Sequence, residues 1–274
     1  MKYPLLGILS FLSIIYFDRV KKQYTYTLIL LLFFLYMVWR IVNDREKNTY
    51  QFPCGVAPTS LNKIDIDSLG VQLVLNTPYK WGKNKLLVYF VDVEDEDLMD
   101  KTVKTANTWS RYSNIKFELT SSIYESDLRV SFLAKKGYAS ALGIEAEEYK
   151  FLGKPTIYLQ NLHKRTDTEF KRVVLHEFGH AIGLEHELQN PEAIIKWDSS
   201  KVYKYYEKIY EWDSVKVNKN IFKKIITDDY SKFDSKSIMI YAVPDSLTKN
   251  GVSIPWPREL SKLDKKTINI FYPF

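Results

Sequence analysis

The chain has 274 residues, 46% of them hydrophobic and 26% charged, and this composition indicates a globular protein with one sizeable domain or two subdomains. Its net charge of +6 comes from lysines that recur between aromatic residues in the C-terminal half, as on a solvated helix face; an anionic substrate or membrane surface is the alternative. The sequence has no motif of a nucleic-acid-binding module, so no nucleic-acid partner is expected, and its single cysteine, Cys54, excludes an intrachain disulfide.

Two apolar runs open the chain, at residues 4–17 and 24–39. Each is somewhat shorter than the roughly 20 residues that span a bilayer, but the tyrosines and the tryptophan at their ends suit a membrane interface. No small-residue cleavage site follows the first run, which disfavours a signal peptide. The second run has no polar face, which disfavours a buried helix. We therefore predict a membrane anchor of one or two transmembrane helices over residues 1–42.

Basic residues on both sides of the second run bear on its orientation. Arg19, Lys21 and Lys22 lie between the two runs and suit a cytoplasmic hairpin tip, which would place the rest of the chain on the extracytoplasmic side. Arg40 and Arg45 after the second run favour the opposite orientation. We expect the extracytoplasmic placement, and the sequence leaves the other one open.

Residues 43–78 are richer in polar residues, proline and glycine, which predicts a linker or pro-region. The segment Phe52-Pro53-Cys54-Gly55-Val56-Ala57-Pro58 lies within it. It is similar to the cysteine-switch segment of matrix metalloproteinases, in which a thiolate blocks a catalytic zinc. It lacks the arginine before the cysteine and the closing aspartate. Cys54 is therefore either a latency thiol or a thiol of no special role.

Apolar periodicity predicts the first half of the folded region. Strands are expected at residues 85–91, 115–120, 128–133 and 156–160. A helix is expected to open in the acidic run 94–97, where carboxylates suit the positive end of the helix dipole. Its apolar positions continue at helical spacing as far as Trp109.

The stretch Val174–Glu187, VLHEFGHAIGLEHE, carries the chemistry. His176 and His180 are four residues apart, so on a helix both imidazoles reach one metal ion. Gly183 allows the helix to end and the chain to turn back, which places His186 as the third ligand. Three imidazoles leave one position of a tetrahedral zinc open for water, and Glu177 is placed to take a proton from that water. The alternative is that the three histidines are hydrogen-bonded residues of a buried helix with no metal, and this fits their spacing poorly. His163, the fourth histidine, is expected to be a loop or surface residue.

The extended histidine motif is that of the metzincins, whose second signature is a downstream Met-turn. Ser237-Ile238-Met239-Ile240-Tyr241 supplies it. Together with Glu187 after the third histidine, these residues resemble the astacin-like zinc metallopeptidases, with matrixin-like features. The resemblance implies that Met239 packs beneath the zinc and that Tyr241 approaches the metal or the tetrahedral intermediate. Astacins usually have histidine where this chain has Ile240, and they carry disulfides that this chain cannot form.

The resemblance also implies a fold class and a domain plan. We expect an α+β domain with a mixed twisted sheet, a zinc helix and a backing helix, followed by an irregular C-terminal part. The predicted domain spans residues 79–274, with an upper subdomain at 79–187 and a lower one at 188–274. Residues 137–143 are expected near an exposed sheet edge, where an extended peptide can pair with the enzyme, or else form a plain surface loop.

Three further local patterns belong to this domain. Thr166-x-x-Glu169 forms a capping box that starts the zinc helix. An amphipathic stripe from Val202 to Trp212 predicts a helix whose aromatic face packs or lines a substrate wall. Ser261-x-x-Asp264 caps a terminal helix.

The sequence thus predicts a membrane-anchored zinc endopeptidase that hydrolyses protein or peptide substrates, with Glu177 as general base. One alternative is a membrane-tethered binding or sensor domain that holds zinc without turnover; retention of Glu177 and Tyr241 disfavours it. Another is an intramembrane protease, which needs the motif inside an apolar span, whereas Lys171, Arg172 and Glu185 flank it here.

Overall fold

The structure, a computed structural model, describes residues 77–225 and 232–274. The predicted membrane anchor and Cys54 lie outside these residues. No helix among those the structure describes is both long and apolar enough to cross a bilayer.

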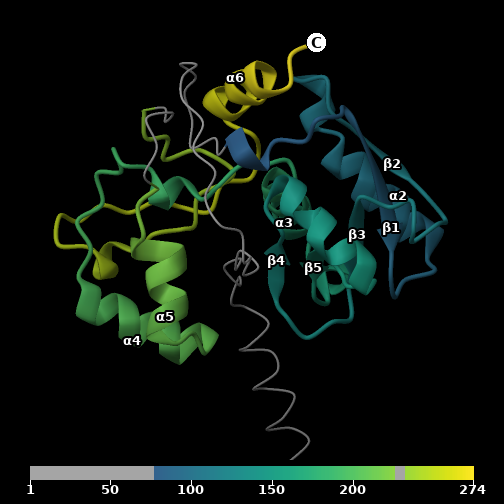
Figure 1. The fold of residues 1–274 in the computed structure, drawn as a ribbon. Helices are drawn as coiled ribbons and strands as arrows, with labels where there is room; N and C mark the ends of the chain where they lie inside the picture. The colour runs from purple at the N-terminus through teal and green to yellow at the C-terminus, as the bar shows by residue number, and fades with distance from the viewer. Residues whose placement is uncertain (1–76, 226–231) are drawn as a thin grey trace, which may run out of the picture. The chain divides into compact units, whose positions relative to one another are not determined.

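A five-stranded sheet forms the first part of the described chain (Figure 1). Its order is β2-β1-β3-β5-β4; the first four strands run parallel and β4 runs antiparallel to β5. The strands span β1 Lys85–Phe90, β2 Lys116–Leu119, β3 Leu128–Ser131, β4 Tyr138–Ser140 and β5 Ile157–Leu159. The predicted mixed sheet is confirmed, with strands slightly shorter than the apolar runs. The segment predicted near a sheet edge contains β4, which is one of the two edge strands.

Two helices pack against each other beside this sheet, α2 (Glu96–Ala106) and α3 (Asp167–Ala181). Asp95 caps α2 by accepting a hydrogen bond from the backbone of Leu98, so the helix starts inside the acidic run, as predicted. Its predicted extension to Trp109 is wrong. Trp109 lies in a separate short 3-10 helix, yet it is fully buried and its indole N–H donates to the carbonyl oxygen of Leu175 at 3.0 Å.

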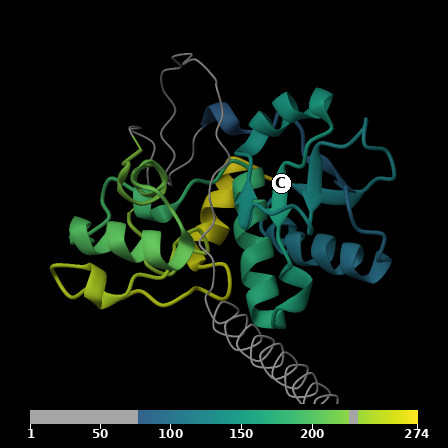
Figure 2. The same ribbon diagram turned by 90° about the horizontal axis from the view of Figure 1, so that it is seen from below.

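The C-terminal part contains α4 (Ser199–Tyr210), α5 (Ser214–Val217) and the terminal helix α6 (Lys262–Phe271). In both views, α4 and α5 lie on the opposite side of α3 from α2 and β1 (Figures 1 and 2). Helix α4 ends at Tyr210 because Glu211 adopts a left-handed conformation, so Trp212 lies beyond the helix predicted to carry it. The aromatic stripe packs: Val202, Tyr206 and Trp212 belong to a buried cluster.

Buried apolar side chains form two clusters. The first lies between the sheet, α2 and α3, and α6 returns to it through Ile268 and Phe271. The second draws on residues from Leu188 onward, including the aromatic face of α4. Helix α3 therefore has the sheet on one side and the second cluster's elements on the other. The subdomain boundary at residue 187 stays a prediction.

Asp264 joins α6 to the Met-turn. It is 1% exposed, and its carboxylate accepts hydrogen bonds from the Ser237 hydroxyl at 2.7 Å and from the backbone N–H groups of Ile238 and Ser261 at 2.8 Å each. The last bond completes a capping box at Ser261, where the sequence predicted a helix cap. One buried carboxylate thus satisfies three donors from two segments.

Replacing Asp264 with alanine should destabilise the fold. The variant leaves the buried N–H of Ile238 without its acceptor and removes the carboxylate half of the capping box, so we expect the free energy of unfolding to fall by about 2–4 kcal/mol. Urea denaturation measures the loss. Asp198→Ala is the matched control, because Asp198 is an aspartate that accepts a backbone hydrogen bond at the start of a helix, α4, but its side chain is 23% exposed. Equal losses in the two variants would contradict the structural role given to Asp264.

Candidate metal centre and active site

Helix α3 carries the first two histidines. Thr166 caps it by accepting a hydrogen bond from the backbone N–H of Glu169, which is the threonine half of the predicted capping box. From Val173 to Ala181 every residue of the helix is buried. His176 and His180 are 2% and 0% exposed and lie one turn apart, so their rings face the same side.

The two rings on α3 are held by backbone carbonyls. Nδ1 of His176 donates to the carbonyl oxygen of Ile238 in the Met-turn, and Nδ1 of His180 donates to the carbonyl oxygen of Leu184, each at 2.7 Å. A proton on Nδ1 leaves the lone pair of Nε2 available to a metal. The Nε2 atom of His176 is buried without a hydrogen-bond partner among the described residues, as expected of an atom that binds a metal.

His186 completes the group because the chain reverses after α3. Gly183 has a φ of 97°, and the next backbone N–H, of Leu184, donates to the carbonyl oxygen of Gly179 at 3.0 Å. The backbone N–H of Glu187 then donates to the carbonyl oxygen of Met239 at 3.0 Å, which fixes the segment that carries His186. The predicted turn at Gly183 is confirmed.

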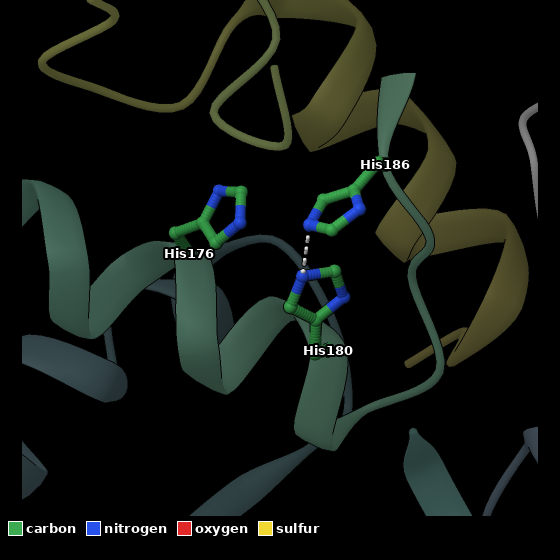
Figure 3. A group of neighbouring side chains, drawn as sticks. All are labelled: His176, His180 and His186. Atoms are coloured by element: carbon green, nitrogen blue, oxygen red, sulfur yellow. Dashed lines mark hydrogen bonds between the residues drawn. The ribbon is translucent and has the colours of Figure 1, made fainter. Parts of the chain in front are cut away.

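The three imidazoles point toward one another (Figure 3). One ligand atom from each histidine lies within 4.8 Å of those of the other two, and the Nε2 atoms of His180 and His186 are 3.0 Å apart. Burial lowers the pKa of all three rings, and that of His180 falls to about 4. They are therefore neutral at neutral pH, which is the form that binds zinc. Three neutral, converging nitrogen donors fit a zinc site.

Met239 packs against the helix that carries His176 and His180. It is fully buried, and a Cβ added to Gly179 of α3 would come within 2.5 Å of its Sδ atom. Real side chains cannot approach so closely, so the thioether packs against the helix only because residue 179 is glycine. Gly179 is the last residue before the second zinc-motif histidine. The helix bearing the ligands and the Met-turn therefore touch at a position without a side chain.

Tyr241 and Glu187 flank the third histidine. The Tyr241 hydroxyl is 2.7 Å from Nε2 of His186. Burial raises the pKa of Glu187 to about 8, while its Oε1 atom accepts hydrogen bonds from the backbone N–H of Asp234 at 2.8 Å and from the side chain of Asn190 at 2.9 Å. Glu187 thus ties the segment after His186 to the chain that leads into the Met-turn.

Comparisons with known proteins assign this chain to a family. The family model described as Matrixin matches residues 80–220. The chain belongs to the matrixin family. It is a metzincin zinc metallopeptidase, as the two sequence motifs predicted. No curated protein matches the chain.

The chain is also similar to solved structures. One structure of myroilysin is 34% identical and aligns with 73% of this chain and 98% of its own, at a TM-score of 0.68. A second myroilysin structure, also 34% identical, aligns with 72% of this chain and 86% of its own, at a TM-score of 0.54. The high choriolytic enzyme 1 of the medaka Oryzias latipes, a hatching-enzyme zinc protease, shares 16% identity over 74% of this chain and 98% of its own, at a TM-score of 0.48.

Most of the site residues chosen from the sequence come together in this matrixin. His176, His180 and His186 converge, with Tyr241 beside the third histidine. Met239 packs against the helix between them. Glu177 is 1% exposed on α3, and its role stays a prediction. His163 lies in a short 3-10 helix and is exposed, with its ring 5.8 Å from that of Phe132. It is therefore a surface histidine, as predicted.

Sequence reasoning missed the residues that support the ligands. The carbonyls of Ile238 and Leu184 carry no signal, because every residue has one. Gly179 could have been noticed as a helix-interior glycine, which needs a packing reason.

Replacing Gly179 with alanine should weaken zinc binding. Alanine favours a helix by about 1 kcal/mol over glycine, so any loss must come from the clash with Met239. That clash displaces the Met-turn carbonyl that holds His176, and we expect zinc affinity to fall by about tenfold or more. Competition with a chromophoric chelator measures this. Gly82→Ala is the control, because a Cβ there meets nothing within 4 Å. Wild-type zinc affinity in Gly179→Ala would refute the packing argument.

Proposed function

We propose that this matrixin is a membrane-anchored endopeptidase in which Glu177 is the general base and Tyr241 binds the developing oxyanion. The observation that carries the proposal is the convergence of three buried, neutral imidazoles with a tyrosine hydroxyl 2.7 Å from one of them. When bound, zinc lowers the pKa of a water ligand and polarises the scissile carbonyl. Protein or peptide substrates follow from this chemistry.

Glu177 supplies the proton transfer in this scheme. It follows His176 directly on α3, so its side chain is attached one residue from a ligand on a rigid, buried helix. From there its carboxylate takes the proton of the attacking water and passes it to the departing amine. A base held on a packed helix needs little reorganisation during the reaction.

Tyr241 lies beside the third histidine. Its ring centroid is 4.5 Å from that of His186, and the residue is 1% exposed. A hydroxyl placed there donates a hydrogen bond to the carbonyl oxygen as negative charge develops on it. Such a donor acts mainly on the transition state, so its loss lowers kcat more than it raises KM.

Peptide recognition falls to the edge strand β4. Its hydrogen-bonded neighbour is β5 on one side only, and α3 packs against it. An extended substrate that pairs with this edge would lie along the helix that carries the ligands. A substrate paired in this way can extend past the metal ligands in both directions, which favours cleavage at an internal peptide bond of the substrate.

Membrane attachment rests on the sequence. The apolar runs at 4–17 and 24–39 and the short basic linker between them support an anchor, with the peptidase domain on the extracytoplasmic side. A non-catalytic zinc domain is the second candidate; the nearness of Tyr241 to His186 speaks against it, since zinc retention alone does not need that hydroxyl.

Replacing Glu177 with glutamine should abolish peptide hydrolysis while zinc is retained. Glutamine keeps the size of the side chain but cannot accept the proton, so we expect kcat to fall about a hundredfold to ten-thousandfold. Tyr241→Phe should lower kcat by about a hundredfold to a thousandfold. Cleavage of a quenched fluorescent peptide, with zinc content by elemental analysis, measures both. Undiminished cleavage by Glu177→Gln would refute the mechanism, and inactivity of the zinc-loaded wild type would favour a binding domain.

The full chain should associate with membranes, because its two apolar runs are the parts long enough to enter a bilayer. After cell lysis we expect it in the high-speed pellet, resistant to carbonate and released by detergent. A chain that begins at Tyr79 should be found in the supernatant. On intact cells, added protease should digest the peptidase domain if it lies outside. Recovery of the full chain in the supernatant would remove the anchor from the proposal.

A further inference from the structure

A cavity of about 970 Å³ lies where β1 and β2 end, beside α2 (Figure 1). Its lining comes from the ends of these two strands, from the loops that follow them and from the first two turns of α2. The strands run parallel, and ligands of parallel sheets commonly bind outside the carboxyl ends of the strands. In the strand order, β2 is the edge opposite to β4. The cavity is therefore separate from the edge proposed to pair with substrate.

Apolar side chains line part of this cavity and stay open to solvent. Val91 is 36% exposed and Leu119 is 41% exposed, and the partly buried Met99 lies with them in the lining. Single exposed apolar residues are ordinary on a protein surface. Three that gather in one concave place indicate a surface that contacts another molecule.

Four acidic residues complete the lining, and no lysine or arginine belongs to it: Asp92, Glu94, Glu96 and Asp100. Asp92 serves the fold, because its carboxylate accepts hydrogen bonds from the Ser131 hydroxyl and from the backbone N–H of Phe132. The other three are exposed and form no ion pair within the described part of the chain. The helix dipole favours Glu96 in the first turn of α2, but it does not account for Glu94 or Asp100.

Carboxylates nearer the amino ends of the same strands are paired. Glu118 pairs at 2.8 Å with both Lys85 and Lys116, the first residues of β1 and β2. Asp127, just before β3, pairs with Lys83 at 2.6 Å. The sheet thus neutralises its carboxylates at one end and leaves them unpaired around the cavity at the other. A positively charged ligand would relieve the repulsion between them.

The spacing of the carboxylates indicates what kind of cation fits. Among the residues that the structure describes, the one group of three or more potential metal ligands that converges is the histidine group. The cavity's carboxylates are therefore too dispersed to share a metal ion. Lysine and arginine side chains suit such a lining, because each joins an apolar stem to a charged end. A volume of about 970 Å³ accommodates a short stretch of extended chain.

We propose that this cavity is a second binding site, which takes an extended segment of a protein substrate that bears lysine or arginine beside apolar residues. That the segment belongs to a substrate rests on the endopeptidase function proposed above, whereas the binding itself does not. At a strand spacing of ~4.8 Å, β2 lies about 20 Å from β4, so a substrate needs more than about ten residues to occupy both places. Attachment at two places raises apparent affinity without changing the chemistry at the zinc.

The binding is tested with zinc-loaded full-length protein that carries Glu177→Gln, so that the probe is not consumed. Fluorescence anisotropy is measured with three labelled dodecapeptides that alternate valine with lysine, glutamine or glutamate. We expect the lysine probe to bind about tenfold or more tightly than the glutamine probe, and the glutamate probe to bind most weakly. The lysine preference should shrink as salt is raised. A hydroxamate that occupies the zinc should leave the probe's affinity unchanged.

The double variant Glu94→Gln/Asp100→Asn removes two of the unpaired carboxylates. We expect its affinity for the lysine probe to fall by about threefold to tenfold, and its affinity for the glutamine probe to stay unchanged. Glu147→Gln/Glu148→Gln is the matched control, because it removes the same charge from two exposed residues that do not line the cavity. That control should bind the lysine probe as the unaltered protein does.

Hydrolysis gives a second measurement once Glu177 is restored. In the Glu94→Gln/Asp100→Asn variant we expect KM to rise by a similar factor for a long peptide that carries a basic segment beyond its cleavage site. Its kcat should not change, because the interaction is the same in the ground state and the transition state. A short peptide without that segment should keep its KM.

Equal affinity for the lysine and glutamine probes would overturn the inference, and this comparison requires no cavity variant to fold. Wild-type affinity in Glu94→Gln/Asp100→Asn, or an equal loss in Glu147→Gln/Glu148→Gln, would also overturn it. Displacement of the probe by the hydroxamate would place the probe at the zinc and have the same consequence. Failure of the wild type to cleave any peptide would instead overturn the proposed function and leave the binding result standing.

Discussion

The hydrogen bond from Nδ1 of His176 to the carbonyl oxygen of Ile238 is the interaction on which the site depends. It joins the zinc helix to the Met-turn, 62 residues further along the chain. It also decides which nitrogen of His176 is left for the metal. His180 is fixed by a carbonyl only four residues away, so the local turn after α3 is enough for that ring. One ligand is therefore oriented locally and the other by the tertiary fold.

Much of the site could be predicted from the sequence because its geometry is local. The spacing of His176 and His180 on a helix, and the reversal at Gly183, are properties of neighbouring residues and need no distant partner. Four of the five strands followed from apolar runs in the same way, whereas β4 was not predicted as a strand. Helix ends were less predictable. Trp109 and Trp212 stand at helical spacing but lie beyond helices that end at Ala106 and Tyr210. A large aromatic side chain reaches the core from outside a helix, so spacing alone does not locate the last hydrogen-bonded turn.

The contacts that support the ligands could not be predicted, since their partners are far apart in sequence. Nothing local pairs Gly179 with Met239 or Arg172 with Trp256. Both contacts lie on α3, and in both the partner comes from the chain that follows α5. Two parts of the surface of α3 therefore matter for the site. One face carries the zinc ligands and the Arg172 guanidinium. At Gly179, the lack of a side chain lets the Met-turn pack directly against the helix. The spacing of residues in the motif predicts the ligand face, but it does not predict the contact at Gly179.

The absence of disulfides makes the polar ties within the C-terminal part more important. With one cysteine in the chain, no intrachain covalent bond can hold the Met-turn to the rest of the domain. Asp264 does so by hydrogen bonds, with Ser237 and Ile238 on one side and Ser261 on the other. The cost of burying this carboxylate is reflected in its raised pKa, which desolvation produces against the effect of those hydrogen bonds. In return, Asp264 alone orders both the C-terminal helix and the Met-turn, whose Ile238 carbonyl orients His176. Geometry at the metal ligands therefore depends on a buried polar residue outside both recognised motifs.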